Sequence, residues 1–96
     1  MLTMELLRKR KTELKRIASK YGATNIRVFG SIARGEADEK SDLDILIEVK
    51  RGFTLMKHAG LMLELEELLG CKVDVVVDRS LKPRIKDRVL AEAKPL

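Results

Sequence analysis

The chain has 96 residues, of which 45% are hydrophobic and 36% charged, and its formal net charge is +5 at pH 7. This length supports one modest core, so we expect a single domain over residues 1–96 with no separate lobe for a large substrate. The composition excludes a disordered chain, and only three aromatic residues argue against a base-stacking platform for single-stranded nucleic acid.

Cysteine content and hydropathy restrict the cellular context. Cys71 is the single cysteine, so no intramolecular disulfide can form, and no cysteine and histidine cluster has the spacing of a zinc site. The N-terminus lacks the pattern of a secretory signal, and no run approaches the roughly 20 apolar residues of a membrane span. We therefore expect a cytoplasmic protein with no membrane partner.

The first predicted element is a helix over residues 4–21. Basic side chains separate its apolar positions, and Gly22 is placed to end it. Solvated helix faces explain most of the net positive charge. The apolar positions recur at helical spacing and are expected to face the core: Leu7, Leu14, Ile17, Ala18 and Tyr21.

A short strand follows the first helix. Apolar and polar residues alternate over residues 25–29, which run directly into Gly30 and Ser31. Ser31 is expected to open a short helix through Arg34, and the polar residues 35–41 are expected to form a surface loop.

The second strand is predicted at residues 43–49, where a nearly continuous apolar run indicates a central position in a small sheet. Thr54 can cap a helix over residues 55–69, which Gly70 would end. We expect this helix to present the following stripe to the core: Leu55, Ala59, Met62, Leu65 and Leu69.

The remaining elements are a third strand over residues 72–77 and a last helix from Pro83 to about Ala93. We expect this helix to carry Ile85, Val89 and Leu90 as its apolar positions. Helices and strands alternate along the whole chain, which predicts an α/β fold.

Two aspartates at the start of the second strand are the strongest chemical signal. Asp42 and Asp44 flank Leu43, and the two-residue period of a strand places both carboxylates on one face. Like charges at that spacing repel each other unless a cation lies between them. Mg²⁺, which prefers oxygen ligands, is the expected ion.

A third carboxylate is needed if two metal ions are to be held, and Asp74 is the candidate. It interrupts the apolar run Val73–Val77, in a strand expected to pair beside the one that carries Asp44. The alternative for Asp74 is an edge-strand charge or a salt bridge to Lys72 or Arg79.

The Gly30-Ser31 pair precedes these aspartates by a spacer of ten residues. Glycine lets the backbone approach a phosphate, and the serine offers a hydroxyl and an amide at the start of a helix. The alternative is an ordinary turn with a serine cap. Arg34 is a candidate for pairing with a phosphate, and Lys50 and Arg51 are weaker candidates. We expect His58, the single histidine, to lie at the surface or its boundary.

The segment from Val28 to Gly35, together with Ser41 to Ile47, resembles the signature of the DNA polymerase beta-like nucleotidyltransferase superfamily. More closely, the chain resembles the minimal nucleotidyltransferases, small prokaryotic proteins often paired with HEPN-domain partners in toxin–antitoxin systems. The signature is a Gly-Ser pair, a spacer, Asp-x-Asp and a later strand aspartate, and it maps onto five residues: Gly30, Ser31, Asp42, Asp44 and Asp74.

This resemblance implies a small mixed sheet with helices packed on it. It also implies Mg²⁺-dependent transfer of AMP from ATP to an acceptor hydroxyl. Asp42, Asp44 and Asp74 would hold two Mg²⁺ ions, and Gly30 and Ser31 would hold the β- and γ-phosphates, with Arg34 as a helper. The expected acceptor is a tyrosine of a HEPN-domain toxin, which makes this chain the antitoxin.

Two other functions are compatible with the sequence. The chain could neutralise its partner by masking it, without catalysis. Alternatively, the basic residues between Arg8 and Lys20 could bind nucleic acid, which predicts an affinity that falls steeply with salt. We regard nucleic acid as the less favoured partner, because few aromatic residues are available for stacking.

Overall fold

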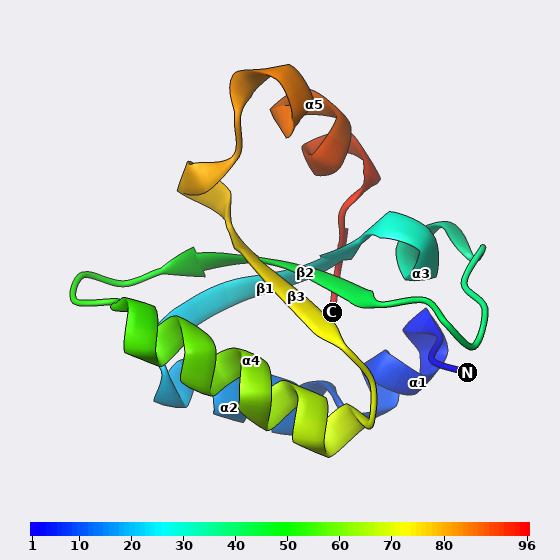
Figure 1. Cartoon of the computed structure of the whole chain (residues 1–96), viewed down its shortest axis with the longest axis horizontal. Coiled ribbons are helices and arrows are strands. Elements are labelled where there is room, and N and C mark those ends of the chain that lie inside the picture. Colours follow the sequence, from blue (N-terminus) through cyan, green and yellow to red (C-terminus); the bar gives the residue numbers. More distant parts are fainter.

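The computed structural model describes all residues from Met1 to Leu96. A four-stranded sheet in the order β3-β2-β1-β4 forms its centre (Figure 1). β2 (Leu43–Val49) is antiparallel to β1 (Ala23–Phe29) and parallel to β3 (Val73–Val77), so the sheet is mixed. The expected α/β fold and the central position of β2 are confirmed.

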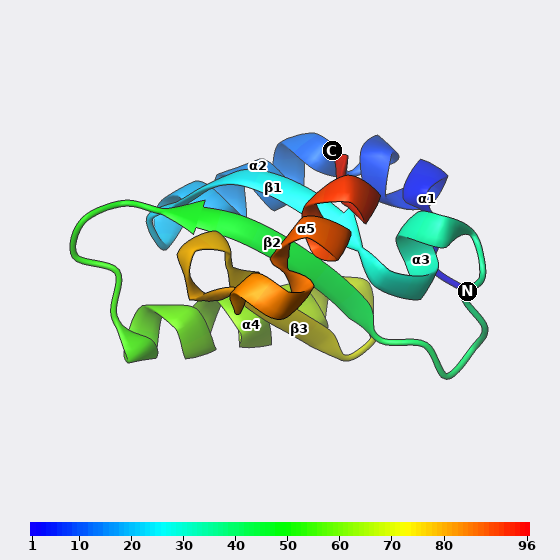
Figure 2. The ribbon, with the colours of Figure 1, turned by 90° about the horizontal axis from the view of Figure 1, so that it is seen from above.

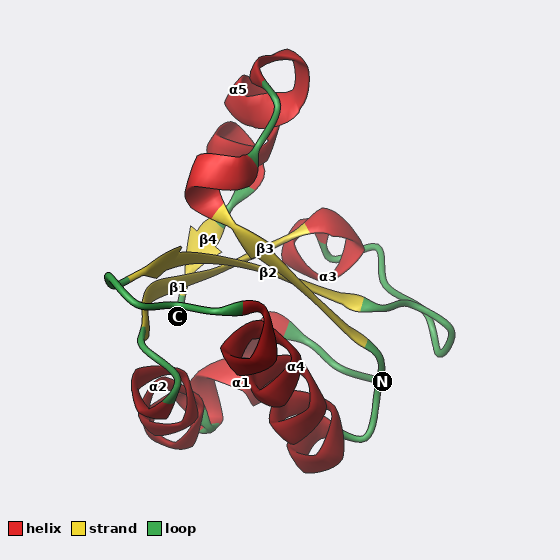
Figure 3. Cartoon of the chain, turned by 60° about the vertical axis from the view of Figure 1, so that its left-hand side comes forward, coloured by secondary structure: helices red, strands yellow, loops and turns green.

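Helices lie on both sides of this sheet. α2 (Lys11–Lys20) and α4 (Leu55–Leu69) cover one face, whereas α5 (Pro83–Glu92) stands on the other side (Figure 3). The view from above shows α3 (Gly30–Arg34) at the end of β1, beside the start of β2 (Figure 2). A short 3₁₀ turn, η1 (Asp78–Ser80), joins β3 to the segment that precedes α5. None of the helices has the length and hydrophobicity needed to cross a membrane.

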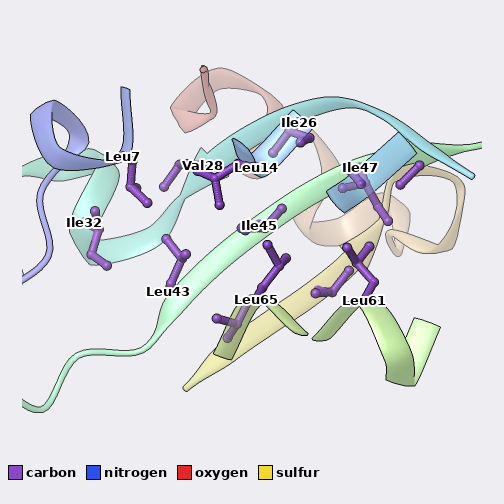
Figure 4. Packing of buried hydrophobic residues seen from close by; sticks show 14 of the residues in the cluster. Leu7, Leu14, Ile26, Val28, Ile32, Leu43, Ile45, Ile47, Leu61 and Leu65 are labelled. Carbon is purple, nitrogen blue, oxygen red and sulfur yellow. The ribbon is translucent and has the colours of Figure 1, made fainter. Parts of the chain in front are cut away.

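The main core lies between the sheet and the layer of α2 and α4 (Figure 4). β2 contributes Leu43, Ile45 and Ile47 to it, and α4 contributes Leu61 and Leu65. Because side chains alternate along a strand, the residues between these β2 positions project to the opposite face. On that face Leu46 and Val89 of α5 are both buried, so α5 covers part of the sheet.

The predicted first helix is divided in two. α1 (Met4–Lys9) and α2 meet at Arg10, whose backbone leaves helical geometry at φ −108° and ψ 16°. The Arg10 side chain donates a hydrogen bond to the carbonyl oxygen of Leu68 at 3.2 Å. The bend keeps both Leu7 and Leu14 in the core as the chain passes around the sheet.

The face that α4 turns to the core agrees with the prediction at Met62, Leu65 and Leu69 and differs from it in the first half of the helix. Leu61, which was not predicted, is buried, whereas Leu55 is 84% exposed and Ala59 is also exposed. Thr54 caps the helix as predicted, because its hydroxyl accepts a hydrogen bond from the backbone N–H of Lys57 at 3.2 Å. The helix is apolar on several sides, so its periodicity does not select one of them.

The C-terminal elements show two further differences. Of the apolar residues expected to pack from α5, only Val89 is buried, while Ile85 and Leu90 are each 38% exposed. β4 (Lys94–Pro95) is a two-residue strand that pairs with the middle of β1 and was not predicted. Its pairing depends on where α5 returns the chain, which local sequence does not determine.

Candidate active site

Three aspartates gather on the sheet face that carries α5. Asp44 of β2 and Asp74 of β3 are register partners in the parallel pair, and Asp42 lies two residues before Asp44. Leu43 and Val73 point the other way, into the core. Since alternate residues of a strand share a face, Asp44 and Asp74 project together to the side opposite α2 and α4. Asp42, just before β2, lines the same cavity.

The environment of Asp44 opposes its negative charge. Partial burial raises the pKa of the Asp44 carboxyl, and the nearby carboxylates of Asp74, Asp42 and Glu92 raise it further. Arg34 is the one group that acts in the opposite direction. None of the three aspartates forms a salt bridge, so the alternative of a structural ion pair for Asp74 does not hold.

The three aspartates line a cavity of about 420 Å³ at the start of β2 and β3. Lys72 and Glu66 form part of its wall. No three acidic, histidine or cysteine side chains converge closely enough to enclose a metal ion by themselves. The donor set nevertheless fits a hard cation, because it consists of carboxylate oxygens whose mutual repulsion a divalent ion relieves.

Gly30 brings the turn after β1 against this carboxylate cluster. Its backbone has φ +77°, a conformation that favours glycine, and it begins α3. A Cβ atom at residue 30 would overlap Oδ2 of Asp44 and lie 3.1 Å from its Cγ. The Gly-Ser turn and the Asp-x-Asp strand are therefore in direct contact, with Ser31 half-buried beside them.

Arg34, at the end of α3, is held by two glutamates. Its Nε donates to Glu36 at 2.8 Å, and its Nη1 donates to Glu92 at the end of α5. Glu92 was not predicted as a site residue, although its side chain is only 18% exposed and its charge acts on Asp44. No local motif marks Glu92, because it reaches the site only through the packing of α5.

Other candidates lie elsewhere. Lys50 and Arg51 follow the carboxyl end of β2, whereas the aspartates are at its start, so the weaker prediction of phosphate contacts from them was wrong. His58 is partly buried at the boundary, as expected, and its Nε2 donates to the carbonyl oxygen of Val75 at 2.8 Å. Asp78 pairs with Arg27 at 3.0 Å, away from the three aspartates.

The sequence over residues 7–96 matches the family described as the nucleotidyltransferase domain. The chain belongs to this family. Its fold places the signature residues of the resemblance in one region, because Gly30 packs on Asp44 and Asp44 is paired with Asp74. The identification as a minimal nucleotidyltransferase is confirmed.

A related nucleotidyltransferase is the protein adenylyltransferase MntA of Thermococcus cleftensis. The two sequences are 44% identical over 96 residues, which cover 96% of this chain and 94% of the relative. A solved structure described as a minimal nucleotidyltransferase superposes with a TM-score of 0.87 at 49% identity. That alignment covers 99% of this chain and 97% of the other.

A more distant solved structure shares the fold. It is the complex of a tri-AMPylated HEPN toxin with its MNT antitoxin from Shewanella oneidensis. The matched chain has a TM-score of 0.69 at 19% identity, over 92% of this chain and 69% of the other.

Proposed function

We propose that this chain transfers AMP from ATP to a hydroxyl group, with a tyrosine of a HEPN-domain toxin as the acceptor. The main support is the contact of the Gly30 turn with Asp44. The negative charges of Asp74 and Asp42 act on the Asp44 carboxyl. This contact brings a turn suited to phosphates against a cluster suited to a divalent cation. The protein adenylyltransferase among the relatives supports AMP as the transferred group.

Asp42, Asp44 and Asp74 would hold two Mg²⁺ ions together with oxygen atoms of the nucleotide. When bound, Mg²⁺ would neutralise charge on the triphosphate and lower the pKa of the acceptor hydroxyl. The protein would supply the orientation of the phosphates. Gly30 would let them approach the backbone closely, and the hydroxyl and amide of Ser31 would donate hydrogen bonds to them.

Arg34 would assist the departure of pyrophosphate. Its guanidinium can pair with phosphate oxygens as negative charge develops there, and such charge-assisted hydrogen bonds are among the strongest. In the structure this guanidinium forms salt bridges with both Glu36 and Glu92. Binding of a triphosphate would therefore require Arg34 to exchange at least one glutamate for a phosphate.

The proposed acceptor follows from the shape of the chain and from its relatives. The three aspartates line a cavity at the start of β2 and β3, in a structure that consists of one sheet and its covering helices. A partner protein can bring its own hydroxyl to such a site. The complex of a HEPN toxin with an antitoxin of the same fold supports a HEPN-domain protein as that partner.

Transfer can be tested with ATP labelled at the α-phosphate, Mg²⁺ and a native lysate. The wild-type protein is expected to label one protein band, and Asp44→Asn is expected to label none. Asp87→Asn serves as the control, because Asp87 is an exposed carboxylate on α5 without a salt bridge. Label in RNA would exclude a protein acceptor. ATP binding without any transfer would instead favour neutralisation of the partner by masking.

A further inference from the structure

The outer side of α4 carries an apolar stripe that nothing in the chain covers. Leu55 is 84% exposed, Met56 85% and Leu63 60%. Ala59 lies between them and is exposed as well. Three of the seven large hydrophobic residues with high exposure thus lie on this one helix, while the other four are distributed over the N-terminus, α1 and α5.

The position of this stripe excludes a role in the core. Leu61 and Leu65, on the opposite side of α4, already fill the space under the sheet and are 0% and 3% exposed. Positions four residues apart lie above one another on a helix, so Leu55, Ala59 and Leu63 form a continuous line. Contiguous apolar surface of this kind on a soluble domain is typical of an interaction site.

Charges at the two ends of α4 differ in sign. Lys50 and Arg51 lie in the turn before the helix, and neither forms a salt bridge. Glu67 is exposed and unpaired in the last turn, next to Glu64, which binds Lys20 at 2.8 Å. The apolar line is therefore flanked by a basic end and an acidic end.

We propose that two copies of this chain associate through their α4 helices, packed antiparallel about a twofold axis at Ala59. In that arrangement Leu55 of each copy faces Leu63 of the other, and the Arg51 end faces the Glu67 end. Antiparallel self-pairing is the arrangement that matches a helix with opposite charges at its ends, whereas parallel pairing would oppose like charges. The small side chain of Ala59 lets the two helices approach closely at the axis.

The proposed interface does not include residues that line the candidate active site. Met62 and Glu66 of α4 line the cavity of the three aspartates, whereas Leu55, Ala59 and Leu63 do not. α4 packs under the sheet (Figure 3). Asp44 and Asp74 alternate with core residues of β2 and β3, so they project to the opposite face. The association does not depend on the proposed AMP transfer, and its test needs no assay of activity.

Sedimentation velocity over concentrations from about 1 µM to about 1 mM tests the proposal. The wild-type chain is expected to pass from monomer to dimer in this range, and Leu63→Glu is expected to stay monomeric. Leu6→Glu is the matched control, because Leu6 is 45% exposed on α1, away from the stripe. Circular dichroism confirms that both variants are folded. A monomeric wild type, or a Leu63→Glu variant that still dimerises, would overturn the proposal.

Charge exchange tests the antiparallel orientation. Arg51→Glu and Glu67→Arg are each expected to weaken dimerisation roughly three- to ten-fold, because each change affects two symmetric pairs at the exposed ends of the interface. The double variant is expected to regain most of the wild-type affinity. If the double variant is weaker than either single variant, the two ends do not face each other and the antiparallel arrangement is wrong.

Discussion

Gly30 and Asp44 are in direct contact, although they belong to different elements and are separated by a polar loop. The carboxylate of Asp44 occupies the space in which any side chain at residue 30 would begin. Phe29, the residue before Gly30, is the register partner of Asp44 in the antiparallel pair of β1 and β2. The glycine of the signature is thus required by the aspartate as well as by the turn.

Gly30→Ala is expected to destabilise the fold and abolish AMP transfer. The added methyl group would overlap the Asp44 carboxylate, and the alanine backbone would have to keep φ +77°. We expect the overlap to cost about 1–3 kcal/mol beyond the penalty for that backbone conformation. Gly22→Ala isolates that penalty, because Gly22 has φ +81° and a Cβ atom there would have no neighbour within 4 Å. Chemical denaturation of both variants measures the difference. Equal losses of stability would show that the contact with Asp44 is not restrictive.

Asp44→Asn is expected to stabilise the protein at pH 7 by roughly 0.5–2 kcal/mol while removing transfer. Burial and the neighbouring carboxylates raise the pKa of Asp44 in the folded state, so folding favours its protonated form. The stabilising contribution of protonated Asp44 is therefore present below its unfolded pKa and lost as pH rises through its folded pKa. The gain in free energy of unfolding from Asp44→Asn should shrink as pH falls toward 3.8, the ordinary pKa of aspartate.

Thermal unfolding between pH 3.5 and 7, with Asp87→Asn as control, measures this trend. A constant difference across that range would contradict it.

Mg²⁺ and ATP together are expected to raise the unfolding temperature of the wild type more than either does alone. The reason is that the carboxylates and the triphosphate both need the cation to bind side by side. A ligand at 100 times its dissociation constant stabilises the folded state by about 2.7 kcal/mol. Thermal unfolding with and without a chelator measures the effect. The same shift in Asp44→Asn would show that this carboxylate does not participate.

Glu92→Gln is expected to strengthen ATP binding by roughly three- to ten-fold, which corresponds to about 1 kcal/mol. The change removes a negative charge that acts on Asp44 and releases one of the two partners of Arg34. Glu36→Gln is the matched control, because Glu36 also binds Arg34 but is not among the groups that act on Asp44. Isothermal titration calorimetry with ATP and Mg²⁺ compares the two. Weaker binding in Glu92→Gln would mean that Glu92 supports the nucleotide site instead of opposing it.

Strands β1, β2 and β3 and the composition of the candidate site could be predicted from the amino-acid sequence. The apolar run of β2 indicated its central position, and the two-residue period placed Asp42 and Asp44 on one face, because both properties follow from local backbone geometry. The position of Asp74 in a similar run was also enough to predict pairing beside Asp44. The catalytic and metal-binding roles of these residues remain predictions.

Which surfaces face each other depends on the packing of the whole chain. α4 is apolar on several sides, and its packing under the sheet selected Leu61 and Leu65 for the core and left Leu55 outside. Glu92 is distant from the signature in sequence and reaches Arg34 because Val89 anchors α5 on the sheet. Local periodicity indicates which residues share a face of a helix or strand, but packing against the rest of the chain determines which face is buried.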